Sequence, residues 1–459
     1  MTETQIDTQT VPNPQLNYPK PVYAWSMVGF LTLAYIFSML DRYILGYLTK
    51  PIKADLGFTD TQMGWLALAF TLLYAFAAIP FGMLTDRKKR VWIIALGITV
   101  WSLATVATGI VTNFATGFTM AFIFFFLARM FVGFGEAVLS PAAFSIIGDS
   151  FPKERRAKPI AFYSAALFLA SSLTGFIIKF LLGYFETVGA LTFPIVGELA
   201  PWQMIMVIVG APGLLVAVLF FFLKEPARTE SQQTDDSRYS DAIKFAMKRW
   251  KTFMCFVSIF VTMVSIAYVQ FNWLPEMFER TYGEENWGRG LYAGRNATAT
   301  LIFAVPTYFA AGVISDAWSK RGRTDAPFIL AIIGLFIMVP TTIIAPLMPT
   351  GWGAFGMLCF GTVGIGLISS TGVTALLQIT PGYVRGSIVA YYYLAITLLG
   401  GLISPLLVGW LSTSIFGEDR LNLAVAAQPA IYGIPTLLLL PITYRLYRKE
   451  LALREAQSV

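Results

Sequence analysis

The chain has 459 residues, of which 56% are hydrophobic and only 13% are charged, and its mean hydropathy is +0.66. These values exclude an ordinary soluble globular protein and indicate an integral membrane protein. The net charge of +7 would also suit a nucleic-acid-binding protein, but an excess of basic residues in cytoplasmic loops explains it better, so no nucleic-acid partner is expected.

Residues 1–23 are largely polar and lack the basic start and short apolar core of a signal peptide, so a cytoplasmic tail is expected. After this tail, long apolar runs recur, and each is long enough to cross a membrane as a helix. The sequence therefore predicts twelve membrane-spanning helices. Their approximate ranges are 24–48, 61–84, 91–112, 119–147, 158–185, 203–223, 251–278, 291–314, 327–347, 353–379, 386–414 and 425–446.

Lys and Arg are distributed unevenly between the predicted loops. The loops on one side of the membrane hold 24 of the 33 Lys and Arg residues, whereas the loops on the other side hold five. Because cytoplasmic loops are enriched in these residues, both termini are expected in the cytoplasm. The five residues on the opposite side are Lys50, Lys53, Arg280, Arg289 and Arg420.

The first predicted span carries two adjacent charged residues, Asp41 and Arg42. Neighbouring side chains point about 100° apart on a helix, so these two do not pair well with each other. Arg42 therefore needs a partner elsewhere, and the candidates are Glu136 of span 4 or an anionic group of a substrate. Of the 26 acidic residues, only Asp41 and Glu136 lie well inside predicted spans.

The fourth predicted span contains the stretch RMFVGFGEA, residues 129–137. Seven residues separate Arg129 from Glu136, which places both side chains on one helix face, about 10 Å apart along the axis. A charged side chain at the centre of a lipid-facing helix costs about 3 kcal/mol or more, so such residues face a bundle interior or a watery cavity. The stretch therefore predicts a polar surface inside a membrane bundle.

The longest polar interruption, residues 224–250, divides the twelve predicted spans into two sets of six. We expect an N-terminal six-helix bundle over 24–223 and a C-terminal six-helix bundle over 251–446, joined by a cytoplasmic linker over 224–250 and followed by a cytoplasmic tail over 447–459. Within the linker, residues 238–250 fit an amphipathic helix on the inner membrane surface.

A short pattern occurs twice, once after the second span and once after the eighth. The first copy is GMLTDRKKR, residues 82–90, and the second is GVISDAWSKR, residues 312–321. Each copy has a glycine, three residues, an aspartate and then a basic cluster, at matching positions of the two halves. An internal repeat of this kind is typical of secondary transporters built from two related bundles around a midplane site.

These two loop motifs and the stretch at 129–137 resemble the major facilitator superfamily. Within it, the Asp41-Arg42 pair and the segments PIKADLGFTDTQMGWL (51–66) and GFGEAVLSPAAFSIIGDSFPKERR (133–156) are most similar to the Spinster-like branch. The resemblance covers residues 24–446. It implies an all-α integral membrane protein with twelve transmembrane helices in two pseudo-symmetric six-helix bundles, the major facilitator fold, in a bacterial inner membrane.

The chain departs from the usual pattern of this superfamily at two positions. Lys89 stands where the first loop motif usually has glycine, and Ala317 stands where the second usually has arginine. The two loops are therefore not expected to contribute equally. The resemblance implies a cytoplasmic latch between the halves, and simple topogenic charge is the alternative. The latch would consist of Gly82, Asp86, Arg87, Arg90 and Asp316.

The buried charges lead to a hypothesis about coupling. The sequence has no histidine, so an imidazole proton relay is excluded and any proton coupling must use a carboxylate. Asp41 and Glu136 are the expected proton carriers, with Arg42 and Arg129 as countercharges that also meet an anionic substrate group. The resemblance implies the same roles. The alternative is a static buried network that only fixes helix packing.

Further candidates for a substrate site are polar or aromatic residues within the predicted spans. Lys179 of span 5 either binds a headgroup or phosphate or extends its amino group to the outer interface. For the others, ordinary packing or interhelical hydrogen bonding is the competing explanation. These others are Tyr74, Tyr268, Asn272 and Tyr392.

The sequence also excludes several functions. Cys255 and Cys359 both fall in predicted spans, so no disulfide is expected, and no Cys/His metal cluster or nucleotide-binding fingerprint is present. No cofactor, no metal and no enzymatic activity are therefore expected. A membrane sensor would usually carry a larger extra cytoplasmic domain than the linker provides.

The expected function is alternating-access transport driven by an ion gradient, most simply by protons. The resemblance suggests an amphipathic lipid with an anionic head, such as a lysophospholipid or sphingoid-type molecule. The alternative is a small organic anion, such as a sugar acid or carboxylate. The expected partners are the substrate, protons and membrane lipids, and a monomer is expected.

Overall fold

The N-terminal bundle consists of helices and one short hairpin. The structure, a computed structural model, describes residues 18–152, 155–228, 236–381 and 384–458. The elements of this bundle are α1 (Pro21–Tyr47), α2 (Thr49–Leu56), α3 (Asp60–Arg87), α4 (Arg90–Ile110), η1 (Val111–Phe114), α5 (Phe118–Glu136), α6 (Leu139–Ser150), α7 (Ala157–Val188), β1 (Leu191–Phe193), β2 (Gly197–Leu199) and α8 (Pro201–Phe222). Strands β1 and β2 pair in antiparallel fashion between α7 and α8.

Helix α9 (Asp236–Lys248) follows in the chain and confirms that the linker forms a helix. The C-terminal bundle comes after it. Its elements are α10 (Trp250–Tyr282), α11 (Glu284–Trp287), α12 (Arg289–Ala299), η3 (Thr300–Ala304), α13 (Val305–Lys320), α14 (Ala326–Ile344), η4 (Ala345–Leu347), α15 (Gly351–Ile379), α16 (Arg385–Ile396), η6 (Thr397–Leu402), α17 (Ile403–Leu411), η7 (Ser412–Phe416), η8 (Glu418–Arg420) and α18 (Leu421–Ser458).

Twelve segments of the described chain are long and apolar enough to cross a membrane, which confirms the predicted number and makes this a multi-pass membrane protein. Three of the predicted spans consist of several pieces: span 4 contains α5 and α6, span 8 contains η3, and span 11 contains η6 and η7. The pieces η3, η6 and η7 are π-helical. Proline favours such interruptions because it has no N–H for the carbonyl four residues earlier, and Pro306 and Pro405 follow η3 and η6.

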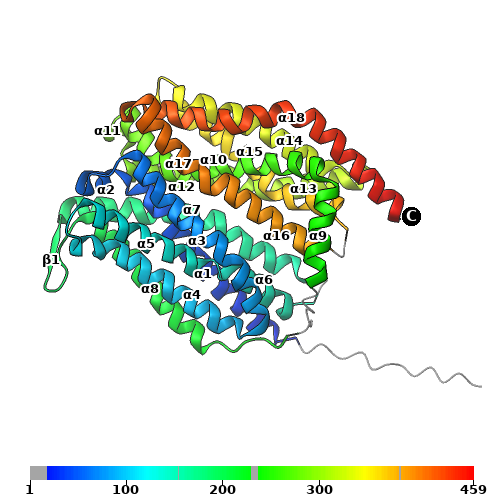
Figure 1. The fold of residues 1–459 in the computed structure, drawn as a ribbon, viewed down its shortest axis with the longest axis horizontal. Coiled ribbons are helices and arrows are strands. Elements are labelled where there is room, and N and C mark those ends of the chain that lie inside the picture. Colours follow the sequence, from blue (N-terminus) through cyan, green and yellow to red (C-terminus); the bar gives the residue numbers. More distant parts are fainter. Residues whose placement is uncertain (1–17, 153–154, 229–235, 382–383, 459) are drawn as a thin grey trace, which may run out of the picture.

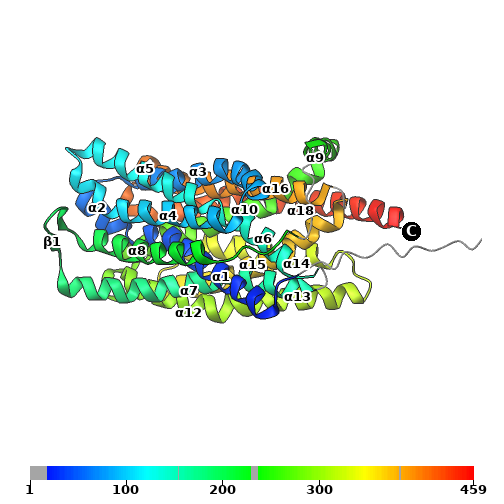
Figure 2. The same cartoon turned by 90° about the horizontal axis from the view of Figure 1, so that it is seen from below.

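The two bundles lie side by side, as the major facilitator fold requires (Figure 1). Helices α1 to α8 form one bundle, and α10 to α18 form the other. The molecule has two distinct ends, which we name the α2 end, where α2, α11 and the β1–β2 hairpin lie, and the α9 end, beyond which α18 extends (Figures 1 and 2).

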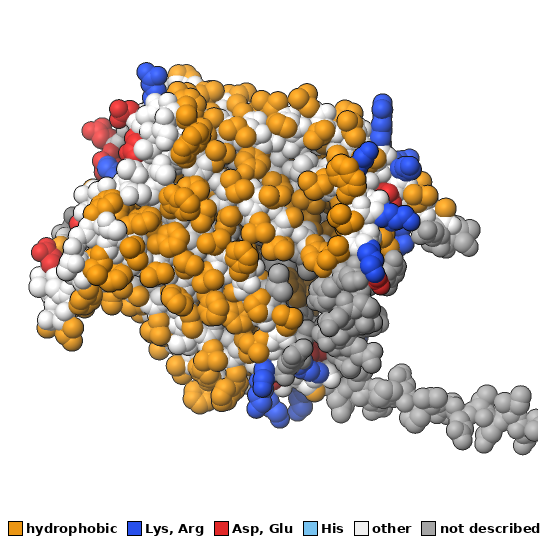
Figure 3. Space-filling view, viewed as in Figure 1, with side chains coloured by type: hydrophobic (Ala, Val, Ile, Leu, Met, Phe, Trp, Pro, Cys, Tyr) orange, Lys and Arg blue, Asp and Glu red, His pale blue; other side chains and the backbone are white. Residues whose placement is uncertain are grey.

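The surface has the polarity of a membrane protein. Hydrophobic side chains cover the middle of the molecule, whereas acidic residues gather at the α2 end and basic residues at the α9 end (Figure 3). Because hydrocarbon offers no partner for backbone polar groups, each span satisfies its own by helical hydrogen bonds. The apolar belt between two charged ends therefore marks the part of the molecule that lies in the bilayer.

The bundles meet closely toward the α2 end. A Cβ added at Gly46 of α1 would lie only 2.0 Å from the backbone oxygen of Phe271 in α10. Only glycine allows this approach, and the ring of Tyr43 stacks on the ring of Phe271 one turn away, with centroids 4.0 Å apart. Helix α3 also contacts α17, and α7 contacts α12, so α1, α3 and α7 of the N-terminal bundle all pack against the C-terminal bundle.

Candidate functional site

Four buried charged residues lie together within the N-terminal bundle, and we name them the central site. Asp41 and Arg42 come from α1, and Arg129 and Glu136 come from α5. Arg42 Nη2 donates to Glu136 Oε2 at 2.8 Å, so of the two partners considered for Arg42, Glu136 and an anionic substrate group, Glu136 is the one it contacts in the structure. Arg129 Nη1 lies 3.5 Å from the backbone carbonyl of Asp41. The two charged pairs of the sequence are thus assembled on facing helices.

Phe70 of α3 packs between the two guanidinium groups. The Arg42 Cζ atom lies 4.8 Å from the centre of this ring, and the Arg129 Cζ atom lies 5.6 Å from it. Arg42 also lies 5.1 Å from the ring of Tyr74. A cation over an aromatic face is stabilised by the ring quadrupole, most strongly where water is excluded. The rings therefore hold the arginines at separate, fixed positions beside the carboxylates.

A glycine on α5 makes this arrangement possible. A Cβ added at Gly133 would lie 2.0 Å from the backbone oxygen of Phe70. The backbones of α3 and α5 are therefore in direct contact at the level of the central site. Gly133 and Gly135 belong to the stretch predicted to form a polar surface, and the structure assigns them to close helix packing.

Replacing Gly133 with Leu is expected to lower the midpoint of thermal unfolding markedly in detergent, because overpacking a tight contact costs about 1–3 kcal/mol or more. Gly29→Leu is the matched control, since nothing lies within 4 Å of a Cβ at this helical position. Unfolding monitored by intrinsic fluorescence compares the two variants. Equal midpoints for both variants would contradict the role of Gly133.

Glu136 lies where the fourth span is interrupted. Helix α5 ends at Glu136, and α6 begins at Leu139, whereas the sequence predicted one continuous helix. Pro141 explains the break, because it has no N–H to donate to the carbonyl of Ala137. Irregular backbone at membrane depth is tolerated only inside protein or beside a cavity. Glu136 is thus held at a helix end and not within a rigid helix.

Several polar atoms of the central site lack hydrogen-bond partners among the described residues. They are Asp41 Oδ1, Arg42 Nε, Arg129 Nε and Glu136 Oε1. An unsatisfied buried polar group costs about 1–3 kcal/mol, so most native structures avoid it. Free carboxylate oxygens are positions where a proton can be held, and the free Nε of Arg42 is a donor for an anion.

The four residues differ in their access to the space between the bundles. The side chain of Arg42 is 18% exposed, whereas that of Glu136 is fully buried. Arg129 is 1% exposed, so the structure does not place it where a substrate group would touch it. Of the two arginines, only Arg42 is accessible to an anion in this conformation, whereas Arg129 is enclosed beside the backbone carbonyl of Asp41.

The C-terminal bundle faces the central site with tyrosines. Tyr268 of α10 lies close to the Arg42 guanidinium, and Asn272 donates to the backbone oxygen of Tyr268 at 2.7 Å. Tyr392 is buried and packs against Phe260, with ring centroids 5.3 Å apart. The adjacent Tyr393 is exposed instead and lies near Tyr74 of the opposite bundle. Tyr393, rather than the predicted Tyr392, therefore lies on the side of α16 that faces the opposite bundle.

Among the latch residues whose side chains the structure describes, none is seen to join the two bundles in this conformation. Arg90 bonds to Asp149 of α6 and, at 2.8 Å from Nε to Oε1, to Glu225 of the linker. Asp316 is exposed, and nothing lies within 4 Å of a Cβ built at Gly82. The side chains of Asp86 and Arg87 lie outside the described residues.

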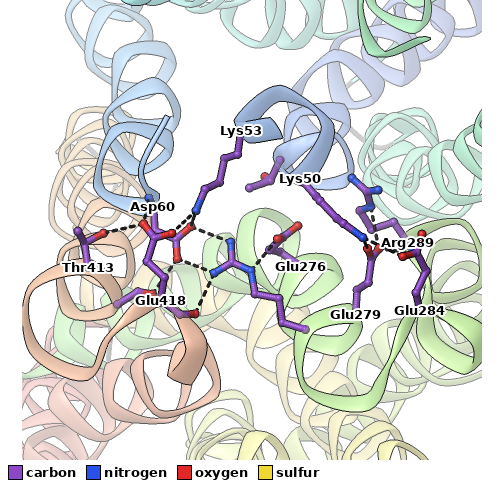
Figure 4. Close-up of polar contacts among 12 residues, drawn as sticks. Lys50, Lys53, Asp60, Glu276, Glu279, Glu284, Arg289, Thr413 and Glu418 are labelled. Carbon is purple, nitrogen blue, oxygen red and sulfur yellow. Dashed lines mark hydrogen bonds and ion pairs between the residues drawn. The ribbon is translucent and has the colours of Figure 1, made fainter. Parts of the chain in front are cut away.

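An ion-pair cluster that the sequence did not reveal joins the bundles at the α2 end, and we name it the outer clamp (Figure 4). Its centre is Asp60, which is fully buried at the first position of α3. Thr59 and Gln62 form a capping box there, and an acidic residue in the first turn is favoured by the helix dipole. The local sequence therefore fixes Asp60 at the bundle interface.

Asp60 binds the opposite bundle through several charged contacts. Arg280 of α10 donates to both carboxylate oxygens, with Nη1 at 2.8 Å and Nη2 at 2.9 Å. Ser412 donates to Oδ2 at 2.7 Å, and the backbone N–H of Asp60 donates to Glu418 at 2.8 Å. Lys53 bridges Asp60 and Glu418. Bidentate Arg–carboxylate contacts are among the strongest hydrogen-bonded pairs in proteins.

A second group of charges extends the outer clamp around Glu279 (Figure 4). Lys50 of α2 bonds to Glu279 and, at 2.9 Å, to Glu284. Arg289 also bonds to Glu279, at 2.8 Å. Burial disfavours the charged form of Lys50, but the two carboxylates outweigh it and raise the pKa of this amino group. The amino group therefore stays charged throughout the physiological range.

One sequence signal does point to the outer clamp. Four of the five basic residues on the sparsely charged side, Lys50, Lys53, Arg280 and Arg289, take part in it. In the sequence, these residues indicate only the orientation of the chain in the membrane. Because the topology assigns few Lys and Arg to this side, each one present there is informative.

Lys179 is separate from the central site. Its stem lies across α12 of the opposite bundle, where a Cβ added at Gly294 would be 2.8 Å from Lys179 Cδ. Lys179 and Arg295 line a cavity between α7 and α12. The expected contribution of Lys179 to the central site is therefore not seen in this conformation.

Comparison with known proteins identifies the family of the chain and several curated relatives, two of which are described here. A family model described as Major Facilitator Superfamily matches residues 31–405. Protein spinster of Drosophila melanogaster is 26% identical over 407 residues, and the match covers 87% of this chain but only 63% of the Drosophila protein, less than two thirds of its length. The Probable L-galactonate transporter of Escherichia coli (strain K12) is 26% identical over 356 residues, which cover 72% of this chain and 71% of that protein.

Solved structures share the fold. A bacterial homologue of the human lysosomal transporter Spinster, in an inward-facing and occupied conformation, superposes with a TM-score of 0.74 at 24% identity. The alignment covers 94% of this chain and 97% of that chain. The same arrangement of two six-helix bundles therefore extends over nearly the whole sequence.

Proposed function

Because the chain belongs to the major facilitator superfamily, we propose that it is a secondary active transporter that works by alternating access and couples protons to an anionic, amphipathic substrate. The observation that carries this proposal is the Arg42–Glu136 ion pair, in which one partner is buried and the other borders the space between the bundles. No enzymatic activity is proposed. The protein acts as a monomer in this scheme.

The coupling follows from competition for one guanidinium group. When Glu136 is ionised, it occupies Arg42 and no charge remains there for a substrate. When Glu136 takes up a proton, the pair is weakened and Arg42 is released to bind an anionic group. Proton uptake and anion binding thus accompany each other, which is the behaviour of a symporter. Asp41, whose backbone carbonyl accepts a bond from Arg129, acts as a further proton site in this scheme.

The surroundings of Arg42 favour an amphipathic cargo. The charges of the central site all come from the N-terminal bundle, whereas the opposite bundle presents Tyr268, Tyr393 and Phe271. A headgroup would meet Arg42, and an acyl chain would lie along the aromatic face of the other bundle. The proposal takes a lysophospholipid or sphingoid-type molecule as the cargo, as the resemblance of the sequence to the Spinster-like branch implies.

A small organic anion is the second candidate. The match to the E. coli protein, which covers 71% of the length of that protein, favours it. A sugar acid has a carboxylate for Arg42 and hydroxyl groups for Tyr268 and Asn272. Such a solute would need polar contacts from both bundles.

The orientation of the chain completes the proposal. We place the α2 end at the outer face of a bacterial inner membrane and both termini in the cytoplasm, as the distribution of Lys and Arg predicts. The outer clamp then seals the outer side, and the substrate reaches the central site from the cytoplasm in this conformation.

Ligand binding to the purified protein tests the substrate proposal. Lysophosphatidylglycerol is expected to raise the thermal unfolding midpoint at lower concentration than L-galactonate does, since a ligand stabilises the folded state it binds. If L-galactonate instead acts at the lower concentration, the small organic anion replaces the amphipathic lipid as the proposed substrate. If neither compound raises the unfolding midpoint, both candidate substrates are excluded.

Replacing Arg42 with Ala is expected to weaken binding of the active compound about tenfold, because a hydrogen bond to a charged group contributes about 1.5–3 kcal/mol. Arg420→Ala, at an exposed arginine of the α2 end, is the control and should bind as wild type does. Wild-type affinity should rise as pH falls, because protonated Glu136 no longer competes for Arg42. Unchanged affinity in Arg42→Ala would refute the headgroup site.

A further inference from the structure

A second cationic cavity lies on the seam between the bundles, apart from the central site. It has a volume of about 390 Å³ and lies between α7 of the N-terminal bundle and α12 and η3 of the C-terminal bundle. Its polar lining includes one cation from each bundle, Lys179 and Arg295. Neither cation takes part in the ion pairs found among the described residues.

Lys179 is held at the seam by its packing. Its aliphatic stem lies on the backbone of α12 at Gly294, where a Cβ would be 2.8 Å from Cδ and 3.6 Å from Nζ. A glycine at this position leaves room for the stem, so the amino group is held against the opposite bundle, in the cavity that Arg295 also lines. The contact distinguishes Lys179 from a lysine that extends freely along a single helix to water.

Arg295 is held by two tryptophan rings. Its Cζ atom lies 4.3 Å from the ring centre of Trp287 and 4.6 Å from that of Trp352. One nitrogen, Nη1, donates to the backbone oxygen of Asn286. Tryptophan is enriched at membrane–water interfaces, and Trp352 begins α15 at the α2 end with most of its side chain exposed. Arg295 is therefore positioned at the depth of lipid headgroups.

The remaining wall is apolar and open to the bilayer. Phe176, Ile302 and Phe303 line the cavity and have exposed side chains. Phe176 also lines an adjoining apolar groove together with Phe180, which is strongly exposed in the hydrophobic belt. A ligand in this cavity would therefore contact two cations in one region and apolar side chains in another.

We propose that the cavity binds the phosphate headgroup of an anionic two-chain phospholipid of the leaflet at the α2 end. Lys179 and Arg295 hold the phosphate from opposite bundles, and the acyl chains lie over Phe176 and Ile302. Lys and Arg side chains near a membrane surface attract anionic lipid headgroups. Because one cation belongs to each bundle, the lipid stabilises the conformation in which α7 packs on α12.

This assignment is independent of the transported cargo. The cargo meets Arg42 between the bundles, whereas the phospholipid binds on the membrane-facing side of the seam. A free phosphate ion would satisfy the cations but not the apolar wall, so the lipid chains are part of the proposed recognition.

Thermal unfolding of the full-length protein in detergent micelles tests the proposal. Dioleoyl phosphatidylglycerol is expected to raise the unfolding midpoint in a saturable way, and dioleoyl phosphatidylcholine much less. Lys179→Ala should need about tenfold more phosphatidylglycerol for half of its own full effect, and Lys179→Arg should restore the wild-type value. Lys251→Ala is the matched control, since Lys251 also lies beside a tryptophan ring, at 5.7 Å from Trp250, but at the α9 end.

Any of the following outcomes would overturn the assignment of the cavity to a two-chain phospholipid. An unchanged titration in Lys179→Ala, or equal weakening in Lys251→Ala, would mean that the lipid acts elsewhere. Equal effects of the two lipids would exclude a charge-selective site. Stabilisation by soluble glycerol phosphate would identify an ion site without lipid. A Lys179→Ala variant in which the response to lysophosphatidylglycerol is weakened and the response to the two-chain lipid is unchanged would make the cavity a site for single-chain lipid instead.

Discussion

Replacing Glu136 with Gln is expected to reduce proton-driven uptake into liposomes by about two orders of magnitude or more. Glu136 is fully buried and pairs with Arg42 at 2.8 Å. Breaking a buried pair costs about 3–5 kcal/mol, and each 1.36 kcal/mol changes a rate about tenfold. Glutamine has nearly the same shape but holds no exchangeable charge, so a pH gradient no longer acts on the central site.

The same variant should still exchange substrate between the two sides when no pH gradient is applied. This difference separates a coupling defect from misfolding. Glu285→Gln, at an exposed residue of α11, serves as the control and should transport as wild type does. Asp41→Asn is expected to lower proton-driven uptake as well. Full proton-driven uptake in both Glu136→Gln and Asp41→Asn would leave the buried charges with a structural role only.

Replacing Asp60 with Asn is expected to shift the protein away from the conformation described here. Asp60 is fully buried and receives bonds from Arg280, Lys53 and Ser412. Removal of its charge leaves two cations without their shared partner, at a cost of about 3 kcal/mol or more. A change of this size moves a two-state equilibrium by about two orders of magnitude. The α2 end should therefore open in a large fraction of molecules.

Distances between spin labels measure this shift. Phe114→Cys and Asp419→Cys place labels at exposed positions of the α2 end, one on each bundle, after Cys255 and Cys359 are replaced by Ser. Asp60→Asn should broaden the distance distribution toward longer values. Asp55→Asn is the control, because Asp55 accepts a bond from Trp202 of its own bundle at 2.9 Å. An identical distribution in Asp60→Asn and wild type would eliminate the clamp as a determinant of conformation.

The sequence predicted the spans well because membrane helices must be both long and apolar. Hydrocarbon leaves a chain few alternatives, so composition alone sets the number of crossings. The Arg42–Glu136 pair was also predictable, because helix geometry separates Arg42 from its neighbour Asp41 and leaves few acidic partners inside the membrane. The interruption after Glu136 was not predicted, although Pro141 is a signal for it in retrospect.

The contacts of the outer clamp could not be predicted from the spacing of residues along the sequence. Asp60 meets Arg280 and Glu418, which are 220 and 358 residues away in the chain. Their contact depends on how the two bundles pack, and periodicity contains no information on this packing. Tyr392 and Tyr393 illustrate the same limit on a smaller scale. They are adjacent, and only the orientation of α16 decides which one is buried.

The break in span 4 has a mechanical consequence. Helix α6 has 12 residues, which corresponds to a rigid rod of about 18 Å. One end adjoins the Glu136 carboxylate, and the other carries Asp149, which is bound to Arg90. Ala137 and Val138 keep right-handed helical backbone angles, so α6 continues the direction of α5 while one hydrogen bond of the helix is missing at Pro141. A displacement of Arg90 at the α9 end would then bend span 4 next to Glu136, which couples the position of one end of the molecule to a buried carboxylate in its middle.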